Sequence, residues 1–243
     1  MNNNETIGMS AEAAACLVFC IFSTINPARI NDYYVNKFLD PIIEGCEENN
    51  IILTEHVGGN NGKVDFKGEL DDPWDPEPNI KLDVSMKSLK GKDGKIAPQG
   101  GQMTYNSFDT TFNCEKPDSS IGRVEANTRR WNWIKNNIAL FLSTMQEKLF
   151  CCDVLLLLEN CEKNPKLQVL KKKDIDYQSM KLEYNHPHYA ENPHKRKPGE
   201  VSEFSTNVFT ILNGEKKNIG EFQFHFKSRK NIKFRFYKKW FMN

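Results

Sequence analysis

The sequence predicts an α/β (α+β) fold, in which helices flank a mixed β-sheet core and further β-hairpins follow near the C-terminus. Three patterns support this: helical apolar stripes near the N-terminus, alternating strands in the middle, and a strand at residues 153–158 that is fully apolar after Asp153. The 243 residues are enough to bury a sizeable core, so we expect a single domain over residues 1–243.

Two helices and a strand are predicted before residue 58. Residues 10–25 are apolar and begin with Ser10, which is suited to capping a helix. Residues 29–48 carry an approximate i, i+4 apolar stripe, and Pro41 inside it predicts a kink or a restart. Residues 51–57 predict a short strand.

Cysteine usage and the first helix indicate a cytoplasmic protein that does not enter a membrane. The seven cysteines are an odd number without C-x-x-C spacing, which favours buried thiols in a reducing compartment. The apolar run at residues 10–25 lacks the positive flank of a signal peptide and is too short to span a bilayer.

A predicted hairpin in the middle of the chain has regular alternation of apolar and polar residues. Its strands are residues 63–70 and 79–89. The prolines between them require a loop, so we expect the two strands to pair antiparallel. With Glu69 opposite Ile80, Asp65 is expected close to Val84.

The remaining segments complete the expected sheet. Residues 90–122 have no clear period and predict a long loop, and residues 124–150 predict one helix. The apolar run at 153–158 is typical of a central strand buried on both faces. Residues 203–213 and 219–240 predict the additional C-terminal strands, the last of them forming a hairpin with one aromatic face.

Charged side chains of the central hairpin point to metal-dependent phosphodiester hydrolysis. Asp83, Ser85 and Lys87 share one strand face, and Asp65 is expected beside them. Paired carboxylates bind Mg²⁺ through hard oxygen ligands, and a nearby lysine orients the attacking water or stabilises developing charge. A surface hairpin with solvated charges is the alternative.

Asp65 followed about 20 residues later by Ser85-Met86-Lys87 resembles the motif of the PD-(D/E)xK nuclease superfamily, which includes most type II restriction endonucleases. The order of elements over residues 29–159, the expected catalytic core, matches that superfamily. Two departures stand out: the motif's proline is absent before Asp65, and Ser85 replaces the usual acid.

The resemblance implies a restriction-endonuclease-like fold and a role for each motif residue. Asp65 would be the principal Mg²⁺ ligand and Asp83 a supporting one. Ser85 would hold the position of the second acid and Lys87 would position the attacking water. Glu44, on the preceding helix, would match the auxiliary acid that some members use.

The implied activity is Mg²⁺-dependent hydrolysis of double-stranded DNA at a short specific sequence, as in type II restriction enzymes. Such an enzyme would act as a homodimer on a palindromic site, with a companion DNA methyltransferase in the same restriction system. Two alternatives stay open: a repair or structure-selective nuclease of the same fold, and a nucleic-acid-binding protein without catalysis.

The charge of the chain is unevenly distributed. Residues 166–243 contain 17 Lys and Arg against 8 Asp and Glu, and the preceding 165 residues contain 16 against 24. A basic segment beside an acidic one favours a polyanion-binding surface next to a cation site, so 166–243 is the expected DNA-recognition region. The candidate DNA contacts are Arg129, Arg130, Lys195, Arg196, Lys197, Gln223, Arg229, Lys230, Asn231 and Arg235. Solvated surface charge is the alternative for these cations.

Overall fold

The computed structural model divides the chain into two compact units. The first contains residues 1–93, 150–173 and 241–243, and the second contains 94–149 and 174–240. The described residues are 3–58, 64–71, 80–91, 94–98, 101–114, 120–184, 204–225 and 231–242. The expected catalytic core at 29–159 therefore includes residues of both units.

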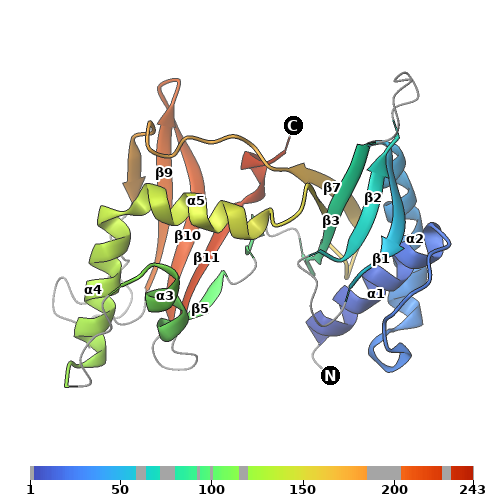
Figure 1. Ribbon diagram of the computed structural model, residues 1–243, viewed down its shortest axis with the longest axis horizontal. Helices are drawn as coiled ribbons and strands as arrows, with labels where there is room; N and C mark the ends of the chain where they lie inside the picture. The colour runs from blue at the N-terminus through green and yellow to red at the C-terminus, as the bar shows by residue number, and fades with distance from the viewer. Residues whose placement is uncertain are drawn as a thin grey trace. The chain divides into compact units, whose positions relative to one another are not determined.

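Five strands of the first unit form one mixed sheet, which two long helices cover (Figure 1). The elements are α1 (Asn3–Val18), η1 (Pro27–Arg29), α2 (Asp32–Glu47), β1 (Ile51–His56), β2 (Phe66–Leu70), β3 (Ile80–Ser88), β6 (Val154–Glu159) and β7 (Lys166–Lys171). The strand order is β1-β2-β3-β6-β7, and β3 and β6 are its one parallel pair. The predicted mixed sheet with flanking helices is confirmed.

The boundaries of the first two helices differ from those expected. The first helix ends at Val18, and Cys20 takes a positive φ of 54° just beyond it. Ser10 lies inside α1, where its hydroxyl accepts a hydrogen bond from Asn31 N (2.9 Å) instead of capping the helix. Pro41 is accommodated within one α2. No helix in the described part of the chain is both long and apolar enough to cross a membrane.

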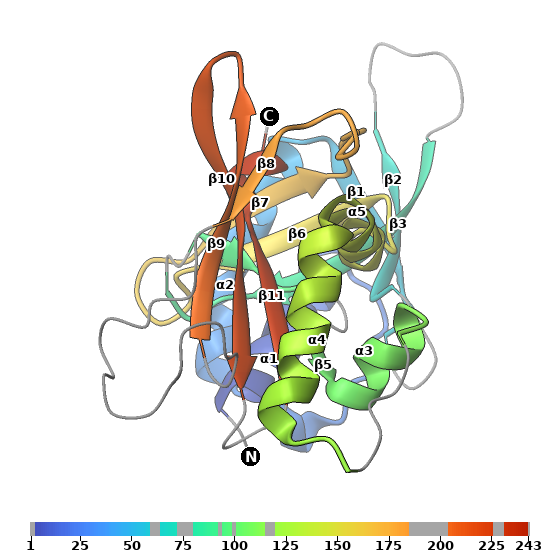
Figure 2. The same cartoon turned by 90° about the vertical axis from the view of Figure 1, so that its left-hand side faces the viewer.

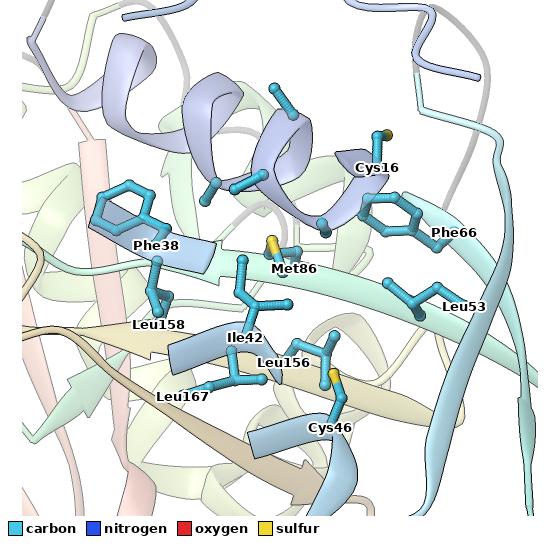
Figure 3. Packing of buried hydrophobic residues seen from close by; sticks show 14 of the residues in the cluster. Cys16, Phe38, Ile42, Cys46, Leu53, Phe66, Met86, Leu156, Leu158 and Leu167 are labelled. Atoms are coloured by element: carbon cyan, nitrogen blue, oxygen red, sulfur yellow. The ribbon is translucent and has the colours of Figure 1, made fainter. Parts of the chain in front are cut away.

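The core of the first unit lies between its helices and its sheet (Figure 3). Phe38 and Ile42 of α2 are fully buried and pack with Leu156 and Leu158 of β6 in one hydrophobic cluster. All six residues of β6 are buried, as the apolar run predicted. Helix α2 approaches the sheet closely at Gly45, where a Cβ atom would lie 2.6 Å from the Cβ of a β7 leucine.

The central hairpin is antiparallel as predicted, but its pairing is shifted by one residue. Glu69 pairs with Lys81 instead of Ile80. Phe66 consequently pairs with Val84 on the core side, and Lys67 faces Asp83 on the other side. This register decides which charged groups of the hairpin meet.

The second unit is built on a separate sheet. Its elements are β4 (Lys95–Ile96), β5 (Gln102–Thr104), α3 (Tyr105–Thr111), α4 (Arg123–Asn136), α5 (Ile138–Leu149), β8 (Leu182–Tyr184), β9 (Phe204–Leu212), β10 (Glu215–His225), β11 (Asn231–Tyr237) and η2 (Lys238–Trp240). The strand order is β4-β11-β10-β9-β8, with β5 also pairing with β11. The expected loop at 90–122 thus contains two short strands and a helix, and the expected helix at 124–150 is two helices separated at Asn137.

Aromatic side chains form the core of the second unit, and α4 and α5 lie against the sheet (Figure 2). Phe222 of β10 and Phe234 of β11 are buried opposite each other. The ring of Phe141 on α5 lies 4.9 Å from Phe222 and 5.4 Å from Phe234, measured between centroids. The aromatic face predicted for the C-terminal hairpin is confirmed as core.

Candidate active site

Asp65 lies just before β2 and is held by the backbones of two neighbouring strands. Its N–H donates to Val84 O (3.0 Å), and its carbonyl accepts from Val57 N (2.9 Å) and Gly58 N (3.0 Å). Its carboxylate Oδ2 accepts a hydrogen bond from Met86 N at 2.7 Å. These contacts fix the carboxylate beside the second half of β3, close to the expected motif residues.

The charge of Asp65 is unfavourable where the structure holds it. Burial raises the pKa of the Asp65 carboxyl, and the Glu12 carboxylate raises it further. The Met86 N–H, Lys87 and His56 act in the opposite direction without cancelling the rise. A buried acid with a second acid beside it is an arrangement that a bound cation stabilises.

Glu12 on α1 and His56 at the end of β1 are the neighbours of Asp65 that sequence reasoning missed. The Glu12 side chain is only 12% exposed, and its Oε2 lies 3.3 Å from Nε2 of His56. The signal available in the sequence was that Glu12 is the one charged residue in the apolar run at residues 10–25. Nothing in local spacing linked that helix to Asp65, because α1 meets the sheet only through tertiary packing.

Ser85 and Lys87 occupy alternate positions on β3, as predicted. Ser85 is 7% exposed and hydrogen-bonds to the thiol of Cys152, whose pKa burial raises to about 11. Lys87 is partly buried, and its charge acts on Asp65. The charge of Lys87 therefore acts on Asp65, and Ser85 lies between Asp83 and Lys87 on the same face of β3.

Asp83 lies at the other end of the same strand face. Four residues along a strand separate it from Lys87 by about 13 Å. Its Oδ1 accepts a hydrogen bond from Lys67 Nζ (2.5 Å), and its N–H donates to Asp153 Oδ2 (2.7 Å). These side chains line a polar concavity of about 470 Å³. Because of the register shift, Asp83 forms a surface ion pair with Lys67, whereas the sequence predicted it beside Asp65.

The acid whose charge acts on Asp65 is not the predicted auxiliary acid, Glu44. Glu44 is exposed on α2, whereas Glu12 is the acid whose charge acts on Asp65. Within the described residues, no three His, Cys, Asp or Glu side chains are grouped so that they could hold a metal ion. A metal at this position would therefore depend on Asp65 and Glu12 together with groups from its substrate or solvent.

The two arginines of α4 have different surroundings. Arg129 is exposed and pairs with Glu125 one turn earlier (3.0 Å). Arg130 is 8% exposed, and its Nε and Nη2 donate to the two carboxylate oxygens of Asp109 at 2.7 and 2.5 Å. Its guanidinium also lies over the ring of Tyr105. Arg130 therefore joins α4 to α3, and its contact with DNA stays a prediction.

Three candidate contacts of the last hairpin are described, Gln223, Asn231 and Arg235, and two of them donate to a buried acid. Glu221 is 6% exposed and accepts hydrogen bonds from Gln223 Nε2 (2.5 Å), Arg235 Nη2 (3.3 Å) and Lys95 Nζ (2.5 Å). Asn231 is 5% exposed. Five other predicted contacts lie outside the described residues: Lys195, Arg196, Lys197, Arg229 and Lys230.

Comparison with known proteins gives one informative similarity. No family model matches the chain. A stretch of 155 residues is 32% identical to the type II restriction enzyme CviAII of Paramecium bursaria Chlorella virus 1. The aligned stretch covers 63% of this chain and 39% of that enzyme, so the chain spans about two fifths of the relative's length. Over most of its residues the chain is therefore similar to a type II restriction enzyme.

Proposed function

We propose that this protein is a Mg²⁺-dependent type II restriction endonuclease of the PD-(D/E)xK superfamily, which cuts double-stranded DNA at a short specific sequence. The observation that carries the proposal is the Asp65 carboxylate, buried beside Glu12 and Lys87, in a chain similar to a type II restriction enzyme. A helix, three antiparallel strands and a later strand parallel to the third also agree with the order expected for that superfamily.

The side chains around Asp65 fit a Mg²⁺ site. Asp65 and Glu12 both offer hard carboxylate oxygens, and their mutual repulsion favours a cation between them. Mg²⁺ bound there would polarise the scissile phosphate and acidify a bound water. In this proposal Glu12 takes the auxiliary role predicted for Glu44, and Asp83 supports the site only if its pair with Lys67 opens.

The two remaining motif residues, Lys87 and Ser85, would have different roles. The Lys87 ammonium would orient the attacking water and stabilise the charge that develops on the phosphate. The Ser85 hydroxyl is hydrogen-bonded to Cys152. It would occupy the position of the usual second acid without contributing a negative charge. One carboxylate fewer on β3 makes Glu12 more important to metal binding than the motif alone implies.

The first unit would carry the chemistry, and the basic C-terminal region would hold the DNA. Binding should depend on salt, because each phosphate contact releases a counterion. Replacing Lys195, Arg196 and Lys197 together by Ala should weaken binding to cognate and random duplexes equally and reduce the salt slope by roughly one unit per lost contact. Titrations at several salt concentrations measure this, and an unchanged slope would remove that segment from the interface.

Incubation of the purified protein with plasmid DNA tests the activity. Discrete fragments in Mg²⁺ or Mn²⁺, and none in excess chelator, are expected for a restriction enzyme. Smearing or preference for branched DNA would favour a repair or structure-selective nuclease, and intact DNA would favour a binding protein without catalysis. A homodimer on a palindromic site predicts binding of two chains per duplex, and a companion methyltransferase predicts protection of methylated plasmid.

A further inference from the structure

The imidazole of His56 is enclosed at the end of β1, next to the proposed metal site. Its side chain is 1% exposed, and its ring lies 4.9 Å from the ring of Phe66, measured between centroids. Both ring nitrogens have polar neighbours: Thr24 at Nδ1 and Glu12 at Nε2. A buried histidine with two defined partners has a defined proton position.

The backbone of Thr24 decides which nitrogen carries the proton. Thr24 N lies 3.2 Å from His56 Nδ1, and a backbone N–H can only donate. Nδ1 must therefore accept. The Thr24 hydroxyl lies 3.0 Å from Nδ1 and 2.9 Å from Gly58 O, and its single proton can be donated to either acceptor, so it is compatible with an accepting Nδ1. The ring proton is consequently on Nε2.

Nε2–H then points to the carboxylate of Glu12. The distance from Nε2 to Glu12 Oε2 is 3.3 Å, and the acid is nearly enclosed. Donation from a fixed ring restricts the rotation of a carboxylate that would otherwise be repelled by Asp65. An outer residue that orients a ligand in this way affects metal affinity without touching the metal.

Gly58 leaves room for the contact between His56 and Glu12, because it has no side chain. A Cβ atom at Gly58 would lie 2.6 Å from His56 Nε2 and 3.3 Å from Glu12 Oε2, closer than the ring can tolerate without moving. The same residue donates its N–H to Asp65 O (3.0 Å). The absence of a side chain here therefore permits the contact between His56 and Glu12 while the backbone holds Asp65.

We propose that His56 is a positioning residue for the metal site: its Nε2–H holds the Glu12 carboxylate beside Asp65, and the Thr24 N–H fixes the required tautomer. The inference rests on the proposed function, because it assigns a role to Glu12 in binding the cation. It extends that function by naming a side chain outside the resembling motif that controls the geometry of the ligands.

A pair of amide substitutions separates positioning from packing. In His56→Gln the side-chain nitrogen reaches about as far as Nε2 and still donates to Glu12. In His56→Asn the amide stops at the level of Nδ1 and leaves Glu12 without its donor. We expect His56→Asn to weaken Mn²⁺ binding about 10- to 100-fold, and His56→Gln to restore most of the affinity. Calorimetric titration of the full chain with Mn²⁺ measures this without relying on cleavage.

Two further measurements complete the test. The ¹⁵N spectrum of the histidine rings in the metal-free protein should show His56 protonated at Nε2 alone, and it should be assigned by loss of the signal in His56→Gln. Tyr177→Phe is the matched control, because it removes a buried hydrogen bond to Gln146 in the other unit and should leave Mn²⁺ affinity unchanged. Thermal melts of all variants verify folding.

The outcomes distinguish this inference from the proposed function. Protonation of Nδ1 overturns the inference whatever the wild type cleaves. Wild-type Mn²⁺ affinity in both amide variants, with DNA still cut, removes His56 from the site and leaves the nuclease proposal standing. Equal loss in both amide variants makes the ring a packing element and also overturns the inference. A wild-type chain that neither binds Mn²⁺ nor cuts DNA refutes the proposed function, and the inference falls with it.

Discussion

Replacing Asp65 by Asn should remove most of the cleavage activity without unfolding the protein. The volume of the side chain is unchanged, and the Asn oxygen can still accept the hydrogen bond from Met86 N. That bond weakens from charge-assisted to neutral, a loss of about 1 kcal/mol. The substitution also removes a buried charge that burial and Glu12 both disfavour, so the two effects oppose each other. The free energy of unfolding should therefore change by no more than about 1 kcal/mol.

The effect of the same change on catalysis should be much larger. Lewis-acid stabilisation by a bound metal contributes several kcal/mol to the transition state. Loss of about 3–5 kcal/mol corresponds to a rate lower by about 10²- to 10⁴-fold. The assay is the initial rate of plasmid cleavage at saturating Mg²⁺, with melting temperatures measured in parallel. Asp40→Asn, which removes an exposed carboxylate from α2 of the same unit, is the matched control.

Stability measured against pH gives an independent check on Asp65. The pKa of its carboxyl is raised in the folded state, so the folded protein binds this proton more tightly than the unfolded chain. The wild type should therefore gain stability relative to Asp65→Asn as pH falls through the raised pKa toward the ordinary pKa of an aspartate in the unfolded chain. Denaturant melts in chelator measure the difference. A strongly destabilised Asp65→Asn, with cleavage reduced only in proportion to the folded fraction, would make Asp65 structural and refute the argument.

Three other predictions address the remaining assignments. Lys87→Ala should lower the cleavage rate by about 10²- to 10⁴-fold while DNA binding persists, and near wild-type rates in the same plasmid assay would exclude it from the site. Arg130→Ala should cost about 3–5 kcal/mol in denaturant unfolding, because it leaves Asp109 buried without its partner, whereas Arg129→Ala should cost less than about 1 kcal/mol. Similar small effects for both arginines would contradict the buried pair. Leu156→Ala should destabilise the first unit by about 2–5 kcal/mol, and a cost below about 1 kcal/mol would argue against the packing of β6 under α2.

Local sequence patterns predicted elements whose structure depends on neighbours along the chain. The alternation of apolar and polar residues identified β2 and β3 as a hairpin, and the apolar run identified β6. The alternating phenylalanines around Phe222 and Phe234 predicted a hairpin with a buried aromatic face. In the two hairpins burial of one face is encoded by side chains that alternate every two residues, and in β6 burial of both faces is encoded by the uninterrupted apolar run.

Boundaries and pairing were predicted less well, because tertiary contacts decide them. The segment at 90–122 has no period of its own and forms β4, β5 and α3, whose strands pair with the distant β11. The hairpin register followed the burial of Phe66 against Val84, which pairs Glu69 with Lys81 and not with Ile80. This difference of one residue is what moved Asp83 from the predicted site into a pair with Lys67.

The sequence alone predicted that Asp65 and Lys87 lie close together on one hairpin, because the alternation of apolar and polar residues is visible in local spacing. Only the tertiary structure decided which other groups surround them. Glu12 and His56 lie near Asp65 because α1 packs across the sheet. Arg130 is buried because it forms an ion pair with Asp109 of α3. Such contacts join residues far apart in the chain, because the packing of apolar faces brings their polar neighbours together. The polar residues themselves show no sequence pattern from which these contacts could be predicted.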